Sequence, residues 1–237
     1  MGVMKREIPL FDTFLDEREV EAVSKVLRSG WLSQGSKVEE FEERFAEFVG
    51  SKYAIAVSSC TSALHLSLVA AGVCDGDEVI TTPFTFIATV NSILYQRAKP
   101  VFVDINPQTL TIEPAEIQSK ITSRTKAIIP VHYAGLPADM RAINEIAQRH
   151  DLKVIEDAAH AVGAVYQDKK AGNLGDYGCF SFYPNKNITT GEGGMVTTND
   201  DKLAKTIRAL ISHGIDSTTY QRQKAEMPWF RLSLIHI

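Results

Sequence analysis

Short β-rich runs alternate with segments of helical spacing along most of this 237-residue chain. The segments in which apolar residues recur every three or four positions are residues 17–27, 38–50, 62–72, 88–96, 140–150 and 202–214. The β-rich runs are residues 53–57, 77–82, 100–104, 126–131, 153–157, 178–182 and 194–199. Because a helix between two strands returns the chain to the same edge of a sheet, this alternation predicts an α/β fold: a mostly parallel sheet flanked by helices.

Sheets of this kind bind ligands beyond the carboxyl ends of their strands. The residues that follow the runs YAIAV, DEVI and KVIE are therefore the first places to look for a functional site. Three classes of protein are disfavoured because their motifs are absent. The chain contains no GxGxxG after a strand, as in dinucleotide-binding proteins, no GxxxxGK[ST], as in P-loop proteins, and no GxSxG, as in serine hydrolases.

The composition is that of a soluble globular protein, with 44% hydrophobic and 23% charged residues. A formal net charge of −4 without a Lys/Arg stripe disfavours nucleic-acid binding. Three separated cysteines, Cys60, Cys74 and Cys179, indicate neither a disulfide framework nor a metal site. No signal-peptide core and no membrane-length apolar run is present, so a cytoplasmic protein is expected.

The first β-rich run is followed by SSCTSALHL, in which hydroxyl residues lead into a helix. Thr61 and Ser62 stand where backbone N–H groups and the positive end of a helix dipole can hold a phosphate. The alternative is that Ser59 or Thr61 only caps the helix.

The second run leads into TTPFTFIATVN, with two phenylalanines beside a proline. Phe84 or Phe86 could stack on a planar heterocycle at the end of a strand. The alternative is that both side chains belong to the core.

In KVIEDAAHA a buried strand ends in two acids, with a histidine three residues later. Asp157 could pair with a protonated ring nitrogen, and His160 could hydrogen-bond the same ligand. The alternative reading makes Asp157 the cap of a turn and His160 a core histidine.

Lys186 lies in SFYPNKNITTGEGGM, between a proline turn and a glycine-rich bend that lets the backbone pass closely. Most lysines are solvated surface charges, but a lysine held near a cationic ring or an apolar wall becomes nucleophilic toward an aldehyde. Ser181 comes just before this turn, at the end of a strand.

Taken in order, these motifs resemble the pyridoxal-phosphate enzymes of fold type I, and more closely the DegT/DnrJ/EryC1/StrS sugar aminotransferase family. The resemblance also includes SGWLSQGSKVEEFEERFAEFVG, GDEVITTPFTFIATVNSI, TKAIIPVHYAGLPADM and HGID. It implies that Lys186 forms the internal aldimine with pyridoxal 5'-phosphate and that Asp157 pairs with the pyridinium nitrogen. His160 would contact the ring hydroxyl and Phe86 would stack on the ring. The same resemblance assigns the phosphate to Thr61, Ser62 and Ser181.

The family implies transfer of an amino group from an amino acid, with glutamate as the expected donor, to a nucleotide-linked keto sugar. Related 3-dehydratases carry histidine in place of the lysine, so Lys186 favours transamination. Asn185 before it separates the chain from cysteine desulfurases, which have histidine there. Two alternatives stay open: a non-catalytic regulatory relative that binds the cofactor or a sugar, and a plain α/β binding module.

The family also implies a homodimer and a smaller C-terminal domain. Residues 1–214 are predicted to form the cofactor-binding large domain with an N-terminal helical segment. Nothing after His213-Gly214 resembles the smaller domain, and the tail ends in the apolar MPWFRLSLIHI. We therefore expect residues 215–237 to be the start of a missing C-terminal region or an aberrant tail, in which case the chain could be an inactive fragment.

Overall fold

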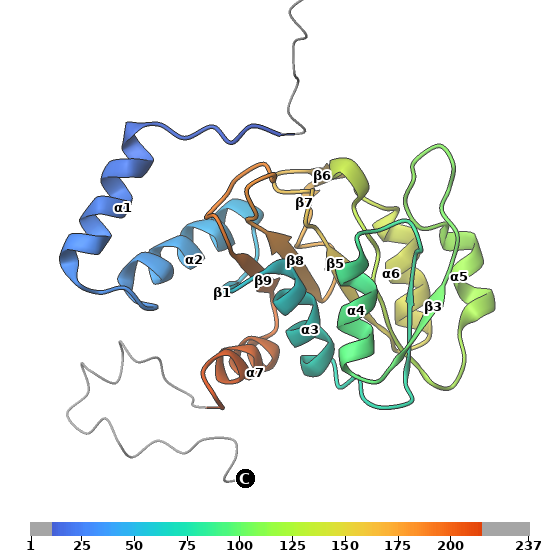
Figure 1. Cartoon of the computed structure of the whole chain (residues 1–237). Coiled ribbons are helices and arrows are strands. Elements are labelled where there is room, and N and C mark those ends of the chain that lie inside the picture. The colour runs from blue at the N-terminus through green and yellow to red at the C-terminus, as the bar shows by residue number, and fades with distance from the viewer. Residues whose placement is uncertain (1–10, 215–237) are drawn as a thin grey trace, which may run out of the picture. The chain divides into compact units, whose positions relative to one another are not determined.

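The computed structural model describes residues 11–214, which form two compact units that divide between Ser33 and Gln34 (Figure 1). The first unit contains the helix α1 (Glu17–Ser29). Its N-cap Asp16 and the side chain of Glu19 form a capping box, and Gly30 ends the helix with φ 73°. The predicted helix at residues 17–27 is confirmed, and its end lies two residues later.

The second unit is built on a seven-stranded sheet with the order β1-β9-β8-β5-β4-β2-β3. The strands are β1 (Tyr53–Val57), β2 (Glu78–Thr81), β3 (Lys99–Phe102), β4 (Thr125–Ile128), β5 (Lys153–Asp157), β8 (Tyr177–Ser181) and β9 (Gly194–Thr198). All neighbours from β8 to β3 are parallel, whereas β9 runs antiparallel to both β1 and β8. The predicted mostly parallel sheet is thus confirmed.

Helices cover both faces of this sheet, which gives three layers (Figure 1). One face packs against α3 (Cys60–Ala70), α4 (Ile87–Tyr95) and α7 (Asp201–Ile211). The other face packs against α2 (Ser36–Val49), α5 (Pro114–Lys120) and α6 (Met140–Arg149). Successive strand residues point to opposite faces, so Ile155 joins the first layer and Val154 the second. This two-sided burial explains why the strands read as nearly continuous apolar runs.

Three small elements escaped the sequence patterns: α5, the short hairpin of β6 (Val165–Tyr166) and β7 (Lys169–Lys170), and the turn η1 (Tyr133–Gly135). The helix α5 has only 7 residues, too few to show a helical period. The sequence nevertheless carries two signals of a helix start, because Glu113 caps α5 and Pro114 occupies its first turn.

None of the helices within residues 11–214 is long and apolar enough to cross a membrane. Residues 215–237, for which we predicted an aberrant tail or an interrupted domain, lie outside the described residues. The predicted domain boundary at residue 214 therefore stays a prediction.

Candidate active site

A cavity of about 840 Å³ opens where the parallel strands of the sheet end. The residues that line it follow β1, β2, β4, β5 and β8, and include Ser59–Thr61, Pro83–Phe86, Val131–Tyr133, Asp157, Ala159, His160, Ser181, Asn185 and Lys186. This is the edge at which α/β sheets bind their ligands. The segments are far apart in the sequence, and only the sheet order brings them together.

Asp157 is the last residue of β5 and only 6% exposed. Its Oδ1 accepts a hydrogen bond from the Ala159 N–H at 3.2 Å, and its Oδ2 accepts one from the Thr89 hydroxyl at 2.7 Å. The capping reading of Asp157 is therefore confirmed. Asp157 also lines the cavity, and its pairing with a ring nitrogen stays a prediction.

Lys186 lies on the connection between the antiparallel strands β8 and β9. Two backbone bonds shape this connection: Lys186 N–H donates to the Tyr183 carbonyl at 2.9 Å, and Thr190 N–H donates to the Phe182 carbonyl at 3.0 Å. Among residues 11–214, no hydrogen bond or ion pair engages the Lys186 amine. A lysine that lines a cavity without a carboxylate partner is available to a ligand.

The N-terminus of α3 forms a second wall. Ser59 is its N-cap and accepts from Ser62 N–H at 3.1 Å, which confirms the capping alternative for Ser59. Thr61 lines the cavity, and its contact with a phosphate stays a prediction. Ser62 does not line it, and its hydroxyl lies 2.9 Å from that of Ser58 and 3.1 Å from that of Ser59.

The surroundings of Gly194 show why the bend after Lys186 needs glycine at this position. A Cβ at Gly194 would lie 2.4 Å from the Ser59 carbonyl carbon and 2.7 Å from the Cys60 nitrogen. Only glycine lets β9 pass this close to the start of α3. The bend therefore fixes the distance between the Lys186 connection and the N-terminus of α3.

His160 is exposed toward the cavity, so the reading of a core histidine is wrong. Partial burial and the nearby Lys186 ammonium lower the pKa of His160, with a smaller opposite effect from Asp157. Its imidazole is accordingly neutral at pH 7 and can donate or accept one hydrogen bond.

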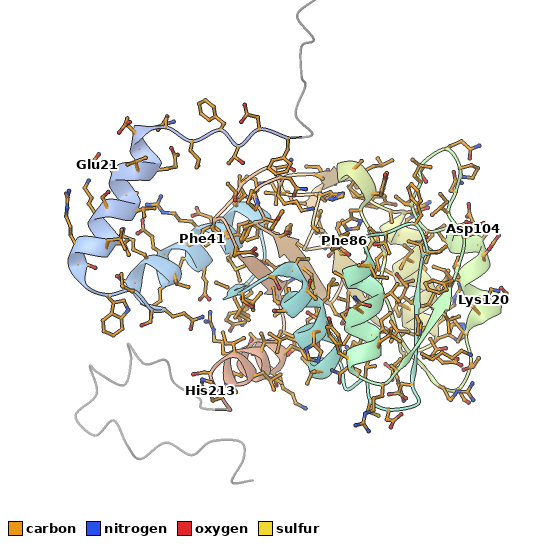
Figure 2. The ribbon with its side chains drawn as sticks, in the orientation of Figure 1. Glu21, Phe41, Phe86, Asp104, Lys120 and His213 are labelled. Atoms are coloured by element: carbon orange, nitrogen blue, oxygen red, sulfur yellow. The ribbon has the colours of Figure 1, made fainter. Side chains whose placement is uncertain are left out.

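The core reading is also wrong for both phenylalanines that follow β2, since Phe84 is 39% and Phe86 75% exposed. Phe86 stands at the start of α4 (Figure 2). Phe84 packs against Tyr133 with ring centroids 4.5 Å apart. Each phenylalanine lines the cavity with an apolar surface that a planar ligand can use.

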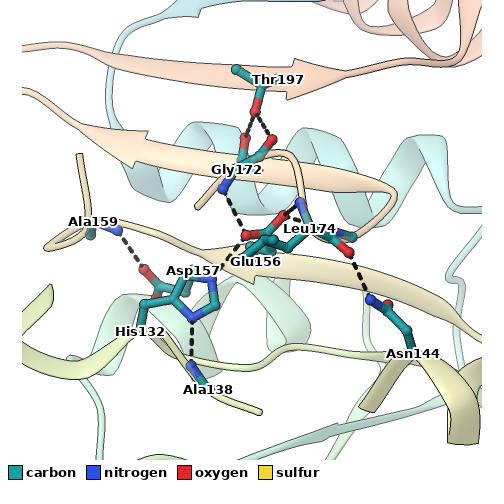
Figure 3. Close-up of polar contacts among 11 residues, drawn as sticks. His132, Ala138, Asn144, Glu156, Asp157, Ala159, Gly172, Leu174 and Thr197 are labelled. Atoms are coloured by element: carbon teal, nitrogen blue, oxygen red, sulfur yellow. Dashed lines mark hydrogen bonds and ion pairs between the residues drawn. The ribbon is translucent and has the colours of Figure 1, made fainter. Parts of the chain in front are cut away.

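The buried carboxylate of Glu156 joins two loops, one of which lines the cavity (Figure 3). Its Oε2 accepts from His132 Nε2 at 2.9 Å and from Gly172 N–H at 2.7 Å. Its Oε1 accepts from the N–H groups of Leu174 and Gly175 at 2.8 and 2.7 Å. Because His132 Nδ1 accepts from Ala138 N–H, the ring proton of a neutral His132 lies on Nε2, facing Glu156. Glu156 thus ties the loop after β4 to the loop before β8.

The structure brings six of the seven predicted site residues to one cavity: Thr61, Phe86, Asp157, His160, Ser181 and Lys186. Ser62 is the exception. Sequence reasoning missed Thr85, His132, Tyr133 and Asn185 as lining residues. For Asn185 the signal was its place beside Lys186, whereas the others carried none beyond their position after a strand. Among residues 11–214, no group of His, Cys, Asp or Glu side chains is placed to hold a metal ion.

The sheet order and the lysine between two antiparallel strands place the chain in the fold type I class of pyridoxal-phosphate-dependent transferases. Residues 13–235 match the model of the DegT/DnrJ/EryC1/StrS aminotransferase family, and the chain belongs to that family.

Individual relatives agree with this assignment. The chain is 48% identical to the spore coat polysaccharide biosynthesis protein SpsC of Bacillus subtilis, over 96% of this chain and 59% of that protein. It is 52% identical to GDP-perosamine synthase of Caulobacter vibrioides, over 85% of this chain and 55% of that enzyme. The PLP form of the putative sugar aminotransferase Spr1654 from Streptococcus pneumoniae superposes with a TM-score of 0.85 at 31% identity, over 89% of this chain and 59% of that one. The chain therefore spans less than two thirds of the length of these relatives.

Proposed function

We propose that this chain is the cofactor-binding part of a pyridoxal-phosphate-dependent aminotransferase that transfers an amino group from an amino acid to a nucleotide-linked keto sugar. The observation that carries the proposal is the convergence of the Lys186 amine, the Asp157 carboxylate and the N-terminus of α3 on one cavity. These three groups come from the ends of β8, β5 and β1.

The residues present fit pyridoxal phosphate. A cavity of about 840 Å³ lies in the range of sites for cofactor-sized ligands. At the N-terminus of α3, Ser62 N–H is taken by Ser59, whereas no backbone bond within residues 11–214 uses the N–H groups of Cys60 and Thr61. Such free N–H groups, with the Thr61 hydroxyl and Ser181, suit a phosphate. Ser62 does not line the cavity, and its hydroxyl instead lies 3.1 Å from that of the N-cap residue Ser59.

When bound, pyridoxal phosphate supplies an aldehyde and an electron-withdrawing ring that accepts electrons from the substrate Cα. Lys186 would hold the cofactor through its amine, and the same amine would move a proton at the substrate Cα as general base and acid. Asp157 holds a proton on the ring nitrogen by pairing with it. His160 would hydrogen-bond the ring hydroxyl, and Phe86 would offer an apolar surface to the ring.

The substrate class rests on the relatives. GDP-perosamine synthase is named for a nucleotide-linked amino sugar, and SpsC for polysaccharide biosynthesis. We extend this class to the present chain, with glutamate as the amino donor. We also propose that the protein is cytoplasmic and forms a homodimer. The helix α4 exposes three apolar side chains, Ile87, Leu94 and Tyr95, and these support a dimer interface on that side.

The proposal is tested by adding pyridoxal phosphate to the purified chain, reducing with borohydride and locating the label by peptide mass spectrometry. We expect a visible absorbance band and a pyridoxyl label on Lys186. Lys186→Ala should lose the label and bind the cofactor at least about 100-fold more weakly, because the covalent bond is lost. The exposed Lys169 is the matched control, since Lys169→Ala should keep both band and label.

A wild-type chain that stays colourless and unlabelled would refute cofactor binding. Addition of glutamate to the loaded protein separates the two remaining readings. A change in the visible band supports an aminotransferase, whereas an unchanged band with bound cofactor supports a non-catalytic relative.

A further inference from the structure

A buried threonine holds the carboxylate of Asp157. Thr89 lies in the first turn of α4 and is 0% exposed. Its hydroxyl donates to Asp157 Oδ2 at 2.7 Å. The same hydroxyl oxygen lies 2.7 Å from the Thr85 hydroxyl. A hydroxyl has a single proton, and that of Thr89 goes to the carboxylate, so the Thr85 hydroxyl must donate to Thr89. The three side chains form a relay from the cavity wall at Thr85 to Asp157.

This relay restricts how the carboxylate can turn. The terminal torsion of an aspartate is soft, with a broad two-fold energy profile. Here the two carboxylate oxygens are bound from different elements: Oδ1 by the Ala159 N–H beyond β5 and Oδ2 by Thr89 of α4. A rotation would leave the Thr89 hydroxyl buried without an acceptor, which is unfavourable. The orientation of Asp157 is therefore set before any ligand arrives.

We propose that Thr89 is a positioning residue for the cofactor: it holds the Asp157 carboxylate in the orientation that receives the protonated ring nitrogen, and Thr85 orients Thr89 in turn. This inference rests on the proposed function, because it concerns the same cavity. Thr89 itself does not line that cavity, so its effect on a ligand passes through Asp157.

The test compares Thr89→Val with Thr89→Ser in the 237-residue chain. Valine removes the hydroxyl and keeps the branched shape, whereas serine keeps the hydroxyl. We expect the dissociation constant of pyridoxal phosphate, measured by absorbance titration, to rise about ten-fold in Thr89→Val, as for one lost hydrogen bond to a charged group. The pH midpoint of the visible band should move by about one unit. Thr89→Ser should stay within about two-fold of wild type.

Thr111 offers a matched control for the loss of a buried hydroxyl. It is 3% exposed, its hydroxyl lies 3.0 Å from that of Thr109, and it does not line the cavity. Thr111→Val should lower the melting temperature and leave both the dissociation constant and the pH midpoint unchanged. If Thr89→Val does not fold, Thr85→Val is the second variant. It removes the outer donor and should raise the dissociation constant about three-fold. Because Thr85 itself lines the cavity, the pH midpoint must shift as well for this variant to support the role of Thr89.

The possible outcomes separate this inference from the proposed function. A wild-type chain that binds no cofactor refutes the proposed function and this inference with it. If wild type and Thr89→Val bind pyridoxal phosphate with the same affinity and the same pH midpoint, only the role of Thr89 is refuted. An equal loss in Thr89→Ser and Thr89→Val would also refute it, because a retained hydroxyl would then not preserve binding and a change in packing would account for both losses.

Discussion

At the scale of single residues, the two adjacent acids at the end of β5, Glu156 and Asp157, have different roles. Successive strand residues point to opposite faces of a sheet. Asp157 therefore lines the cavity, while Glu156 turns away from it and accepts four hydrogen bonds. The sequence motif pointed to Asp157, but nothing in it distinguished a buried structural role for Glu156.

Replacement of Glu156 by glutamine tests this division of roles. Every group around the carboxylate is a donor, so the amide NH₂ of glutamine would face an N–H group and leave it unsatisfied. We expect Glu156→Gln to lower the free energy of unfolding by about 3 kcal/mol or more, as measured by urea denaturation. Glu145→Gln, at an exposed position on α6, is the control and should change it by less than about 0.5 kcal/mol. Equal effects of the two variants would contradict the proposed role.

At the scale of elements, the site depends on how closely β9 passes the start of α3. Helix periodicity predicted α3, but placed its start at residue 62 rather than at Cys60. The first turn lacks a helical apolar pattern because its residues serve the cap and the cavity wall. The glycines after Lys186 were recognised as a close backbone approach, although their neighbour could not be read from the sequence.

Gly194→Ala tests this close approach. The added methyl group would meet backbone atoms of Ser59 and Cys60, which cannot rotate away. We expect a loss of about 2 kcal/mol in unfolding free energy, and weaker binding of pyridoxal phosphate because the N-terminus of α3 is displaced. Gly76→Ala is the control, since it has φ 83° but open space around it. It should cost about 1 kcal/mol and leave cofactor affinity unchanged. Unaltered affinity in Gly194→Ala would contradict the link between the bend and the site.

At the scale of the whole molecule, acid stability should depend on Glu78, the buried first residue of β2. Hydrogen bonds from Thr122 and Arg124 lower the pKa of Glu78 to about 2. A carboxylate whose pKa is lower in the folded state stabilises the fold above its unfolded pKa, which is about 4.3. That stabilisation is lost as the pH falls through this value toward 2.

The check is urea denaturation of wild type and Glu78→Gln between pH 7 and pH 2. We expect wild type to be more stable by about 1–2 kcal/mol above pH 5, and this difference to shrink steadily as the pH falls toward 2. A difference that stays constant across the range would show that Glu78 contributes through packing and not through its charge.

The sequence by itself determined the order and type of most elements, because helical and strand periodicity are local properties that burial on one or two faces imposes. It also suggested the candidate roles of Lys186 and Asp157, since Asp157 ends a strand and Lys186 follows one, each in a recognisable motif. Only the tertiary structure decided that Ser62 does not line the cavity and that Thr89 bonds Asp157, 68 residues away. Partners at that separation meet only through the strand order of the sheet and the packing of α4 on it, which no local pattern encodes.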